Sequence, residues 1–347
     1  MLQQTRVEVV LPYYERFLHR FPTVDELAGS PLDEVLALWS GLGYYRRARQ
    51  LHAAAVRIAA AGELPRTVAG WLELPGVGAY TAAAVTSIAF GVAAPVLDGN
   101  VERVMARRLA LAEDPKLRGA RALLLAGALA LLDPARPGDS NQALMEVGAT
   151  ICLPRRPRCL LCPLRPGCVA AHEGQPERFP PPRRKRQSES RRLLIAVATR
   201  GDRVLLFRRS RQSELLAGTW ELPWLELPPA GVTGDPPAAL ALAEKYGGGH
   251  GWRLGPVLAV VRHGITYRDL EVSVCRGELW PAAADEVREE GAESGWFDAG
   301  QRAALPTSSL VGKALRALAA AESAEQPPRD RRTAGRRRLG RQPQRPR

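Results

Sequence analysis

The sequence predicts a two-part protein, an all-α domain followed by an α+β domain, and three observations support this division. Residues 1–150 carry apolar side chains at helical spacing almost throughout. A stretch rich in proline and basic residues interrupts that pattern over 171–192 and is expected to be a linker. Beyond residue 193, short apolar runs alternate with turn residues, which is typical of strands.

The first part is expected to be helical throughout. Helices are predicted over Val24–Trp39, Arg49–Ala61, Tyr80–Ala89 and Val101–Leu111. The Ala/Leu run Ala120–Leu132 is too short to span a membrane and predicts a buried helix. We therefore expect no membrane partner.

The second part is expected to combine strands with two helices. Gly201-Asp202 separates two apolar runs, which is typical of a β-hairpin. Together the predicted elements define an α+β domain over 193–325. Its strands are expected over Leu193–Thr199, Val204–Arg208, Val257–Val261 and Leu270–Cys275, and its helices over Pro237–Lys245 and Leu310–Ala321.

The positive charge is concentrated in two segments. The formal net charge is +13, to which residues 178–192 contribute +6 and residues 326–347 contribute +8, so the rest of the chain is nearly neutral. Basic segments of this kind favour a polyanion, most simply nucleic acid. A solvated linker and a disordered, solubilising tail over 326–347 are the alternative.

Four cysteines lie close together in the sequence, with gaps of six, two and five residues, at Cys152, Cys159, Cys162 and Cys168. Thiolates spaced this tightly can share a metal centre if the backbone loops around it. Zinc sites usually use two close pairs separated by a longer loop, whereas three unequal short loops suit the corners of a cubane iron–sulfur cluster. Zinc and disulfides remain alternatives, the latter disfavoured because the N-terminus does not resemble a secretory signal.

A glycine turn and an aspartate carry the second chemical signal. Gly76 and Gly78, in the segment LPGVG, permit a turn that leaves the N–H groups of the next helix accessible. Such a turn can bind a phosphate without reading sequence, although a plain helix–helix connection is the alternative. Asp98 opens the helix at Val101, where it is either an N-cap or a carboxylate kept ionised to face a developing positive charge.

The motifs resemble those of a known family. The segments LPGVGAYTAAAV, VLDGNVERV and ICLPRRPRCLLCPLRPGC are similar to the helix-hairpin-helix DNA glycosylase superfamily with its iron–sulfur loop. The segments MLQQTRVEVVLPYYERF, LWSGLGYYRRARQLH and NQALMEVGATIC narrow the resemblance to the adenine DNA glycosylase, or MutY, branch. The resemblance implies a glycosylase domain at 1–170 with the iron–sulfur loop at 150–170. The family removes adenine mispaired with 8-oxoguanine in DNA.

The resemblance also implies catalytic roles. Asp98 matches the carboxylate that stabilises an oxocarbenium-like sugar, with Asn100 and Tyr80 in the same pocket. Strand-cutting members carry a Schiff-base lysine where this chain has Tyr80, and a phenol cannot form an imine, so hydrolysis of the glycosidic bond alone is expected. The implied cofactor is one [4Fe–4S] cluster, ligated by Cys152, Cys159, Cys162 and Cys168.

The implied partner is double-stranded DNA containing A:8-oxoguanine or A:G mispairs. Gln4 and Tyr44 match residues that wedge into the base stack, and Gln142 matches a polar residue of the adenine pocket. Core packing is the alternative for Tyr44. The full set of expected DNA contacts is Gln3, Gln4, Thr5, Tyr44, Gly76, Gly78, Gln142 and Thr266. We expect a monomer in the bacterial cytoplasm, associated with the nucleoid.

The resemblance places the general acid outside the sequence. In the family it is a glutamate two residues before the methionine of MLQQT, and this chain begins at that methionine. We expect the natural protein to be longer, because the match begins abruptly within a helix. The alternative is a catalytically impaired protein that binds DNA lesions.

The second part resembles a Nudix (MutT-like) domain, most clearly in LLAGTWELP, residues 215–223. The glutamate-rich helix that holds magnesium in Nudix hydrolases is represented only by PPAALALAEKYGG, with the single glutamate Glu244, which disfavours nucleotide hydrolysis. The resemblance instead implies recognition of 8-oxoguanine by a loop that corresponds to Ile265-Thr266-Tyr267, where Thr266 supplies a hydroxyl. A plain strand is the alternative for this stretch.

Overall fold

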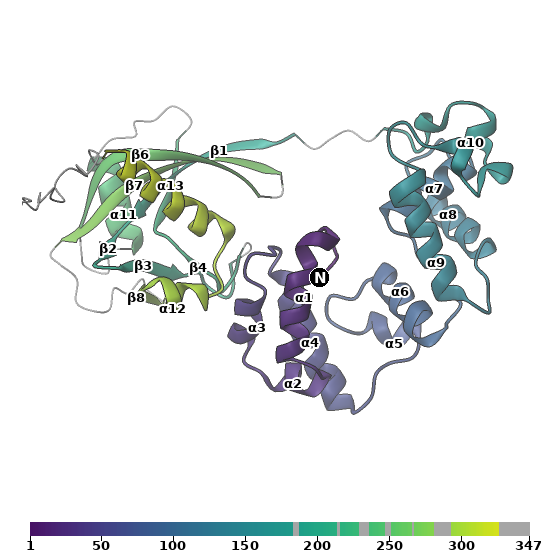
Figure 1. Ribbon diagram of the computed structural model, residues 1–347, viewed down its shortest axis with the longest axis horizontal. Coiled ribbons are helices and arrows are strands. Elements are labelled where there is room, and N and C mark those ends of the chain that lie inside the picture. Colours follow the sequence, from purple (N-terminus) through teal and green to yellow (C-terminus); the bar gives the residue numbers. More distant parts are fainter. Residues whose placement is uncertain are drawn as a thin grey trace, which may run out of the picture.

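The structure is a computed structural model that describes residues 1–182, 187–213, 216–228, 236–246, 251–265, 267–280 and 293–325. Figure 1 shows two groups of helices and a separate α+β body. Within the described ranges, no helix is both long enough and apolar enough to cross a membrane. The tail expected to be disordered, 326–347, lies outside the described residues.

The first lobe packs short helices around aromatic side chains. Phe17 lies edge-to-face with Phe21 and with Trp39, at ring-centroid distances of 5.0 and 6.0 Å. These rings form the centre of a core to which all four helices contribute. The helices are α1 (Val7–Arg20), α2 (Val24–Gly29), α3 (Leu32–Leu38) and α4 (Arg46–Ala61).

The single helix expected over Val24–Trp39 is wrong, because the chain forms α2 and α3 there. Ser30 is extended, with ψ of 147°, and Pro31 follows it. The proline ring clashes with a helical conformation of the preceding residue, so the helix must end before Pro31. The apolar spacing continues across the break, which is why periodicity alone did not reveal it.

The second lobe holds the glycine turn, Asp98 and the cysteines. Helix α6 packs against α9, and α7 packs against α8, α9 and α10. The expected buried helix at Ala120–Leu132 buries only one side, because Leu123 and Leu129 are 58% and 50% exposed. The elements are α5 (Val68–Leu72), α6 (Ala79–Phe90), α7 (Gly99–Arg108), α8 (Arg118–Ala130), α9 (Pro137–Glu146), a π-helical turn (Val147–Ile151) and α10 (Val169–His172).

The α+β body contains two sheets. One has the strand order β5-β1-β7-β6, and the other has β2-β3-β4 with β8 on the free side of β3. Strands β1 and β7 are parallel, and the other strand pairs are antiparallel. The strands are β1 (Glu189–Val197), β2 (Thr199–Arg200), β3 (Arg203–Arg208), β4 (Trp220–Glu221), β5 (Trp224–Leu227), β6 (Gly251–Ile265), β7 (Arg268–Trp280) and β8 (Ser294–Phe297).

Helices cover both faces of β1, which explains its continuous apolar run. Leu193 and Ile195 face a core completed by α13 (Ser309–Glu325), whereas Leu194 and Ala196 face a core completed by α11 (Pro236–Tyr246). The short helix α12 (Ala299–Ala303) follows β8. The predicted hairpin at Gly201-Asp202 is confirmed by the antiparallel pairing of β2 with β3.

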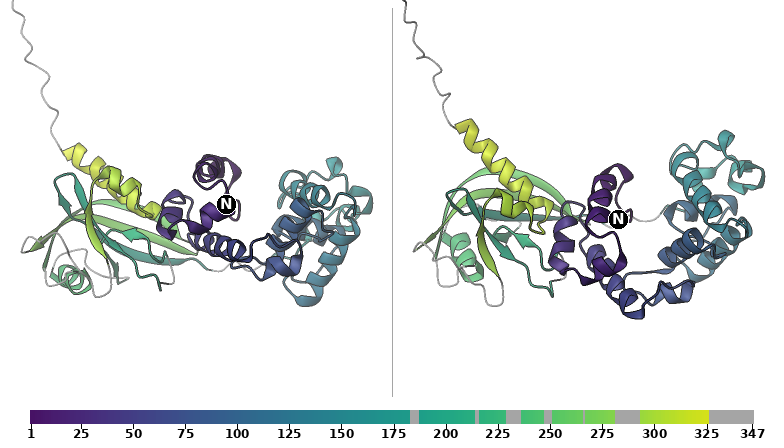
Figure 2. Two further views of the ribbon diagram at one scale, coloured as in Figure 1. Left: turned by 90° about the horizontal axis from the view of Figure 1, so that it is seen from below. Right: turned by 60° about the horizontal axis from the view of Figure 1, so that its bottom comes forward.

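Strands β6 and β7 are much longer than the strands predicted from the sequence, Val257–Val261 and Leu270–Cys275. They pair from Gly251 opposite Trp280 to Ile265 opposite Arg268. Their outer parts carry arginine and glutamate side chains toward solvent, so only the central residues had the composition of a buried strand. Figure 2 shows the α+β body beside the first lobe, with the second lobe farther away.

Candidate active site and cysteine loop

The glycine turn connects α5 to α6, and its two glycines differ in what they require. Gly76 has a φ of 76°, and a Cβ there would stand 2.5 Å from the Cβ of Gln50. Gly76 is therefore needed both for its conformation and for the close approach of α4. Gly78 is extended and has open space around it, so its lack of a side chain leaves the start of α6 accessible.

Asp98 is half-buried at the N-terminus of α7. Its Oδ1 accepts hydrogen bonds from the backbone N–H groups of Asn100 at 3.0 Å and Val101 at 2.7 Å. Its Oδ2 faces the side-chain amide of Asn100 at 3.3 Å. The carboxylate is thus an N-cap whose second oxygen is held in place from the side. The helix dipole favours a negative charge at this position.

Tyr80 lies close enough to Asp98 for the carboxylate charge to affect its pKa. Burial, and then the negative charge of Asp98, raise the pKa of the Tyr80 hydroxyl. The phenol therefore stays protonated at neutral pH and can act as a hydrogen-bond donor. It lies 3.8 Å from the sulfur of Met145 on α9. Gln142 precedes Met145 by three residues, which places it on the same side of α9, where its side chain is exposed.

Arg103 connects the Asp98 end of α7 to the cysteine loop. Its Nη2 donates to Asn100 Oδ1 at 3.0 Å and to the Gly148 carbonyl at 2.5 Å, and its Nε donates to the Cys152 carbonyl at 2.8 Å. A Cβ at Gly148 would stand 2.6 Å from the Cβ of Asn100, so only glycine permits this approach. One guanidinium therefore joins the candidate catalytic residues to the first cysteine.

Arg107, one turn further along α7, organises the cysteine loop itself. It is 3% exposed, and its Nη1 donates to the Cys152 sulfur at 3.3 Å and to the Leu153 carbonyl at 2.7 Å. Its Nη2 donates to the Pro154 carbonyl at 2.9 Å and its Nε to the Phe179 carbonyl at 3.0 Å. A guanidinium can be buried here because its planar donors meet several acceptors.

The four predicted cluster ligands line one small cavity together with Arg107. All four thiols are half-buried and outside any disulfide. Burial raises the pKa of the Cys159 and Cys162 thiols. Among the described residues, no three His, Cys, Asp or Glu side chains converge as ligands of one metal ion. A cubane binds each thiolate to a different iron, so four sulfurs around one cavity, with an N–H donor at Cys152, fit such a group.

Arg47 on α4 connects the N-terminal residues to the turn that carries Tyr44. Arg47 Nη1 donates to the carbonyls of Met1, at 2.8 Å, and Gln3, while its Nη2 donates to the Thr5 hydroxyl at 3.1 Å. Its guanidinium also lies 5.2 Å from the centre of the Tyr44 ring. These contacts hold the first five residues against the turn that carries Tyr44.

Gln4 and Tyr44 share an uncommon backbone conformation, with φ of 60° and 51°. Tyr44 is 47% exposed, so the core-packing alternative does not describe it, whereas the adjacent Tyr45 is 3% exposed. Gln3 lies over α6, where its Nε2 donates to the Thr81 hydroxyl at 3.2 Å. The predicted lesion contact Thr266 lies outside the described residues.

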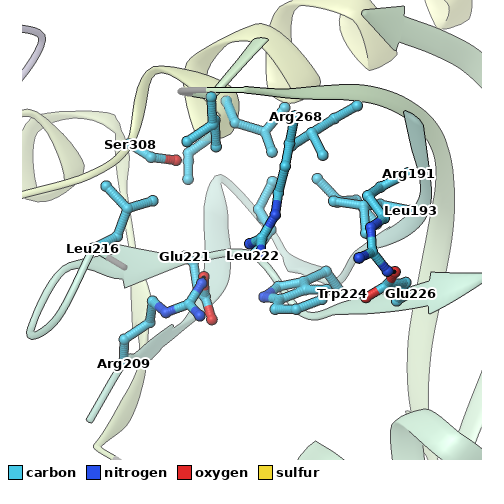
Figure 3. Close-up of a pocket in the computed structure, with 15 residues that line it drawn as sticks. Arg191, Leu193, Arg209, Leu216, Glu221, Leu222, Trp224, Glu226, Arg268 and Ser308 are labelled. Carbon is cyan, nitrogen blue, oxygen red and sulfur yellow. Dashed lines mark hydrogen bonds and ion pairs between the residues drawn. The ribbon is translucent and has the colours of Figure 1, made fainter. Parts of the chain in front are cut away.

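The α+β body has its own cavity, of about 190 Å³, shown in Figure 3. Its two acidic side chains are each paired with an arginine, Glu221 with Arg209 at 2.9 Å and Glu226 with Arg191 at 2.7 Å. Burial raises the pKa of Glu221. Glu244, on α11, is exposed. Each of these two glutamates would therefore have to break its ion pair with an arginine before it could bind magnesium.

Comparison with known proteins identifies the helical part. Residues 1–126 match the family described as HhH-GPD superfamily base excision DNA repair protein. This part of the chain belongs to that superfamily. The chain is 47% identical over 182 residues to the adenine DNA glycosylase of Homo sapiens, covering 52% of this chain and 33% of that protein. It is 39% identical over 277 residues to the adenine DNA glycosylase of Rattus norvegicus, covering 67% and 54%.

A solved MutT protein from Methanosarcina mazei Go1 resembles the α+β body, with 16% identity, a TM-score of 0.33, and coverage of 41% of this chain and 100% of that chain. The chain spans between one third and about half of the length of the two mammalian glycosylases.

Sequence reasoning missed Arg103, Arg107 and Gly148. The signal was present in VERVMARR, where two arginines four residues apart flank the apolar residues of an amphipathic helix. A basic residue on the buried side of a helix needs hydrogen-bond acceptors, and here the cysteine loop provides them.

We expect Arg107→Ala to lower the free energy of unfolding by roughly 3 kcal/mol or more, because each buried acceptor left without a donor costs about 1–3 kcal/mol. Urea titration followed by circular dichroism measures this. Arg118→Ala, at an exposed arginine at the start of α8, is the control and should change stability by less than about 0.5 kcal/mol. Equal effects of the two substitutions would show that the Arg107 contacts do not hold the loop.

Proposed function

We propose that this chain hydrolyses the N-glycosidic bond of adenine mispaired with 8-oxoguanine or guanine in duplex DNA. The observation that carries the proposal is the Asp98 carboxylate at the start of α7, with Asn100 and Tyr80 beside it. The names of the similar proteins, both adenine DNA glycosylases, support the same reaction.

In the proposed reaction, Asp98 stabilises the positive charge that develops on the sugar as the bond to adenine breaks. The two backbone N–H groups that bind Oδ1 and the Asn100 amide at Oδ2 fix the carboxylate before the reaction. A charge held in place this way needs no reorganisation in the transition state. Adenine must first leave the base stack, which costs a few kcal/mol.

The glycine turn would hold the DNA backbone during this step. Gly76 shapes the turn and Gly78 leaves the N-terminus of α6 accessible to a phosphate oxygen. Such contacts position the duplex without reading its sequence. Tyr80 would contribute a hydrogen bond from its protonated hydroxyl, and since a phenol forms no imine, the strand should stay intact.

Recognition of the mispair is assigned to two places. Gln4 and Tyr44 would occupy the space opened in the stack. Arg47 bonds to the neighbours of Gln4 and lies against the Tyr44 ring, which supports this role. The α+β body would contact the opposite base, and Thr266, which lies between β6 and β7 in the sequence, would supply a hydroxyl. We place the protein in the cytoplasm of a bacterium as a monomer that binds nucleoid DNA.

The proposed cofactor is one [4Fe–4S] cluster held by Cys152, Cys159, Cys162 and Cys168. When bound, the cluster would cross-link the loop through four thiolate–iron bonds. Arg107 would donate to the Cys152 sulfur, and Arg103 would connect the loop to Asn100. Hydrolysis requires no redox step.

A catalytically impaired lesion-binding protein is the second candidate. Asp98 is the one carboxylate assigned to the pocket, whereas hydrolysis through an oxocarbenium-like state also uses an acid to protonate the leaving group. Tight binding of A:8-oxoguanine DNA without release of adenine would support this candidate.

We expect Asp98→Asn to lower the rate of adenine release from an A:8-oxoguanine duplex by about 10²-fold or more, with little change in duplex affinity. The substitution keeps the shape of the side chain and removes only the charge needed in the transition state. Alkali treatment after the reaction reveals the abasic site. Asp25→Asn, exposed in the first turn of α2, should behave as the unmodified protein.

Cleavage of the strand before alkali is added would contradict the role given to Tyr80. An unchanged rate in Asp98→Asn would remove Asp98 from the mechanism.

Purified without oxygen, the protein should be brown, with about four irons per chain. Cys159→Ser should lose the colour and iron, whereas Cys275→Ser should keep both, because Cys275 is buried in the core of the α+β body. Metal analysis and the visible absorption spectrum measure this. Stoichiometric zinc without iron, in protein made with sufficient iron, would refute the cluster.

Tyr44→Ala should reduce the preference for A:8-oxoguanine over A:G duplexes by about tenfold, since stacking of an aromatic side chain on a base contributes about 1–3 kcal/mol. Competition binding with the two duplexes measures the preference. Tyr14→Ala, at a tyrosine of similar exposure on α1, is the control. If both variants keep the preference, Tyr44 does not read the lesion.

A further inference from the structure

We propose that Tyr45 is a positioning residue that latches the α+β body to the first lobe and thereby fixes the direction of the neighbouring Tyr44 ring. The contact joins segments more than 250 residues apart in the sequence. Its effect on recognition of the mispair rests on the proposed function, whereas the latch itself does not.

The centre of the latch is a buried tyrosine hydroxyl. Tyr45 is 3% exposed, and its hydroxyl donates to the Thr307 carbonyl at 2.5 Å. Ser40 completes the contact, because its hydroxyl accepts from the Thr307 N–H at 3.4 Å and lies 3.3 Å from the Tyr45 hydroxyl. Burial raises the pKa of Tyr45, so the phenol remains a donor at neutral pH.

Two further contacts extend the latch along the same side of the first lobe. Arg49, one turn after Tyr45 on α4, donates from Nη2 to the Ala217 carbonyl. Arg208, on β3, forms an ion pair with Asp33 on α3, and its side chain is only 11% exposed. Leu216 packs against the core of the first lobe. The α+β body is therefore held to the first lobe by three polar contacts and by the apolar contact of Leu216.

Thr307 is itself fixed to the sheet, so the latch connects rigid elements. Thr307 forms a parallel bridge with Trp220, and the Trp220 N–H donates to the Pro306 carbonyl at 2.8 Å. Trp220 belongs to β4, which pairs with β3 through Arg208. The carbonyl that accepts from Tyr45 therefore moves with β3 and β4.

In the first lobe, the latch adjoins a turn with an uncommon backbone conformation, just before α4. Gly41, Gly43 and Tyr44 have φ of 99°, 73° and 51°. Glycine adopts this conformation at little cost, but a tyrosine does so only when its surroundings impose it. Tyr45 is buried in the core of the first lobe and Tyr44 is exposed. The bond from the Tyr45 hydroxyl to Thr307 therefore restrains the backbone from which the Tyr44 side chain leaves the turn. Docking of the α+β body is thereby coupled to the residue proposed to enter the DNA.

The test removes one oxygen atom, the hydroxyl of Tyr45. In Tyr45→Phe, the segment around Thr307 should exchange its backbone hydrogens about 2- to 10-fold faster, because one hydrogen bond of the latch is lost. Hydrogen exchange followed by mass spectrometry measures this, with thermal unfolding as a check on the fold. Tyr14→Phe, which removes a hydroxyl from an exposed tyrosine on α1, is the control.

Asp33→Asn weakens the same contact between the α+β body and the first lobe in a second way, because it removes the ion pair with Arg208 and leaves Tyr45 unchanged. Both latch variants should also lose about 2- to 10-fold of the preference for A:8-oxoguanine over A:G duplexes, with similar affinity for undamaged DNA. Unchanged exchange around Thr307 in both variants would overturn the latch. Faster exchange with an unchanged preference would overturn the positioning of Tyr44.

If the unmodified protein shows no preference between the duplexes, the proposed function fails, and the exchange measurement still decides whether the latch exists.

Discussion

The buried side of α7 is the constraint on which the rest of the second lobe depends. Arg103 and Arg107 lie one turn apart on α7. Together they bond to Asn100, to the carbonyls of Gly148, Cys152 and Leu153, and to the Cys152 sulfur. A buried guanidinium without acceptors would cost several kcal/mol, so α7 and the cysteine loop can form only together. The same helix begins at Asp98, which ties the geometry of the candidate catalytic carboxylate to the loop that would hold the cluster.

The candidate site residues could be proposed from the sequence, whereas the residues that contact and support them could not. Asp98, the glycine turn and the four cysteines were visible because each has a local signature of spacing or conformation. Arg103, Arg107 and Tyr45 were not, since their roles come from acceptors far away in the sequence, such as the Phe179 and Thr307 carbonyls. The fold class could be predicted from the spacing of apolar residues. The helix break before Pro31 depends instead on one proline, which leaves the apolar spacing unchanged.

The α+β body contains a cavity whose acidic side chains are paired with arginines. Its cavity contains two glutamates, but Arg209 and Arg191 pair with them, and the single glutamate of α11 is exposed. Ion pairs of this kind connect the walls of the cavity, and the described part of the chain has no group of carboxylates placed to bind a divalent cation. Contact with the first lobe through Thr307 and Arg208 instead makes this body part of the surface that carries Tyr44.

The most direct test of the account compares the affinity of the protein for two duplexes that differ only in the charge of the sugar mimic opposite 8-oxoguanine. One carries a cationic pyrrolidine and the other a neutral tetrahydrofuran. A preformed carboxylate at Asp98 should make the protein bind the cationic duplex at least about tenfold more tightly, and Asp98→Asn should abolish that difference. Equal affinity of the unmodified protein for the two duplexes would contradict the role of Asp98 and with it the proposed glycosylase mechanism.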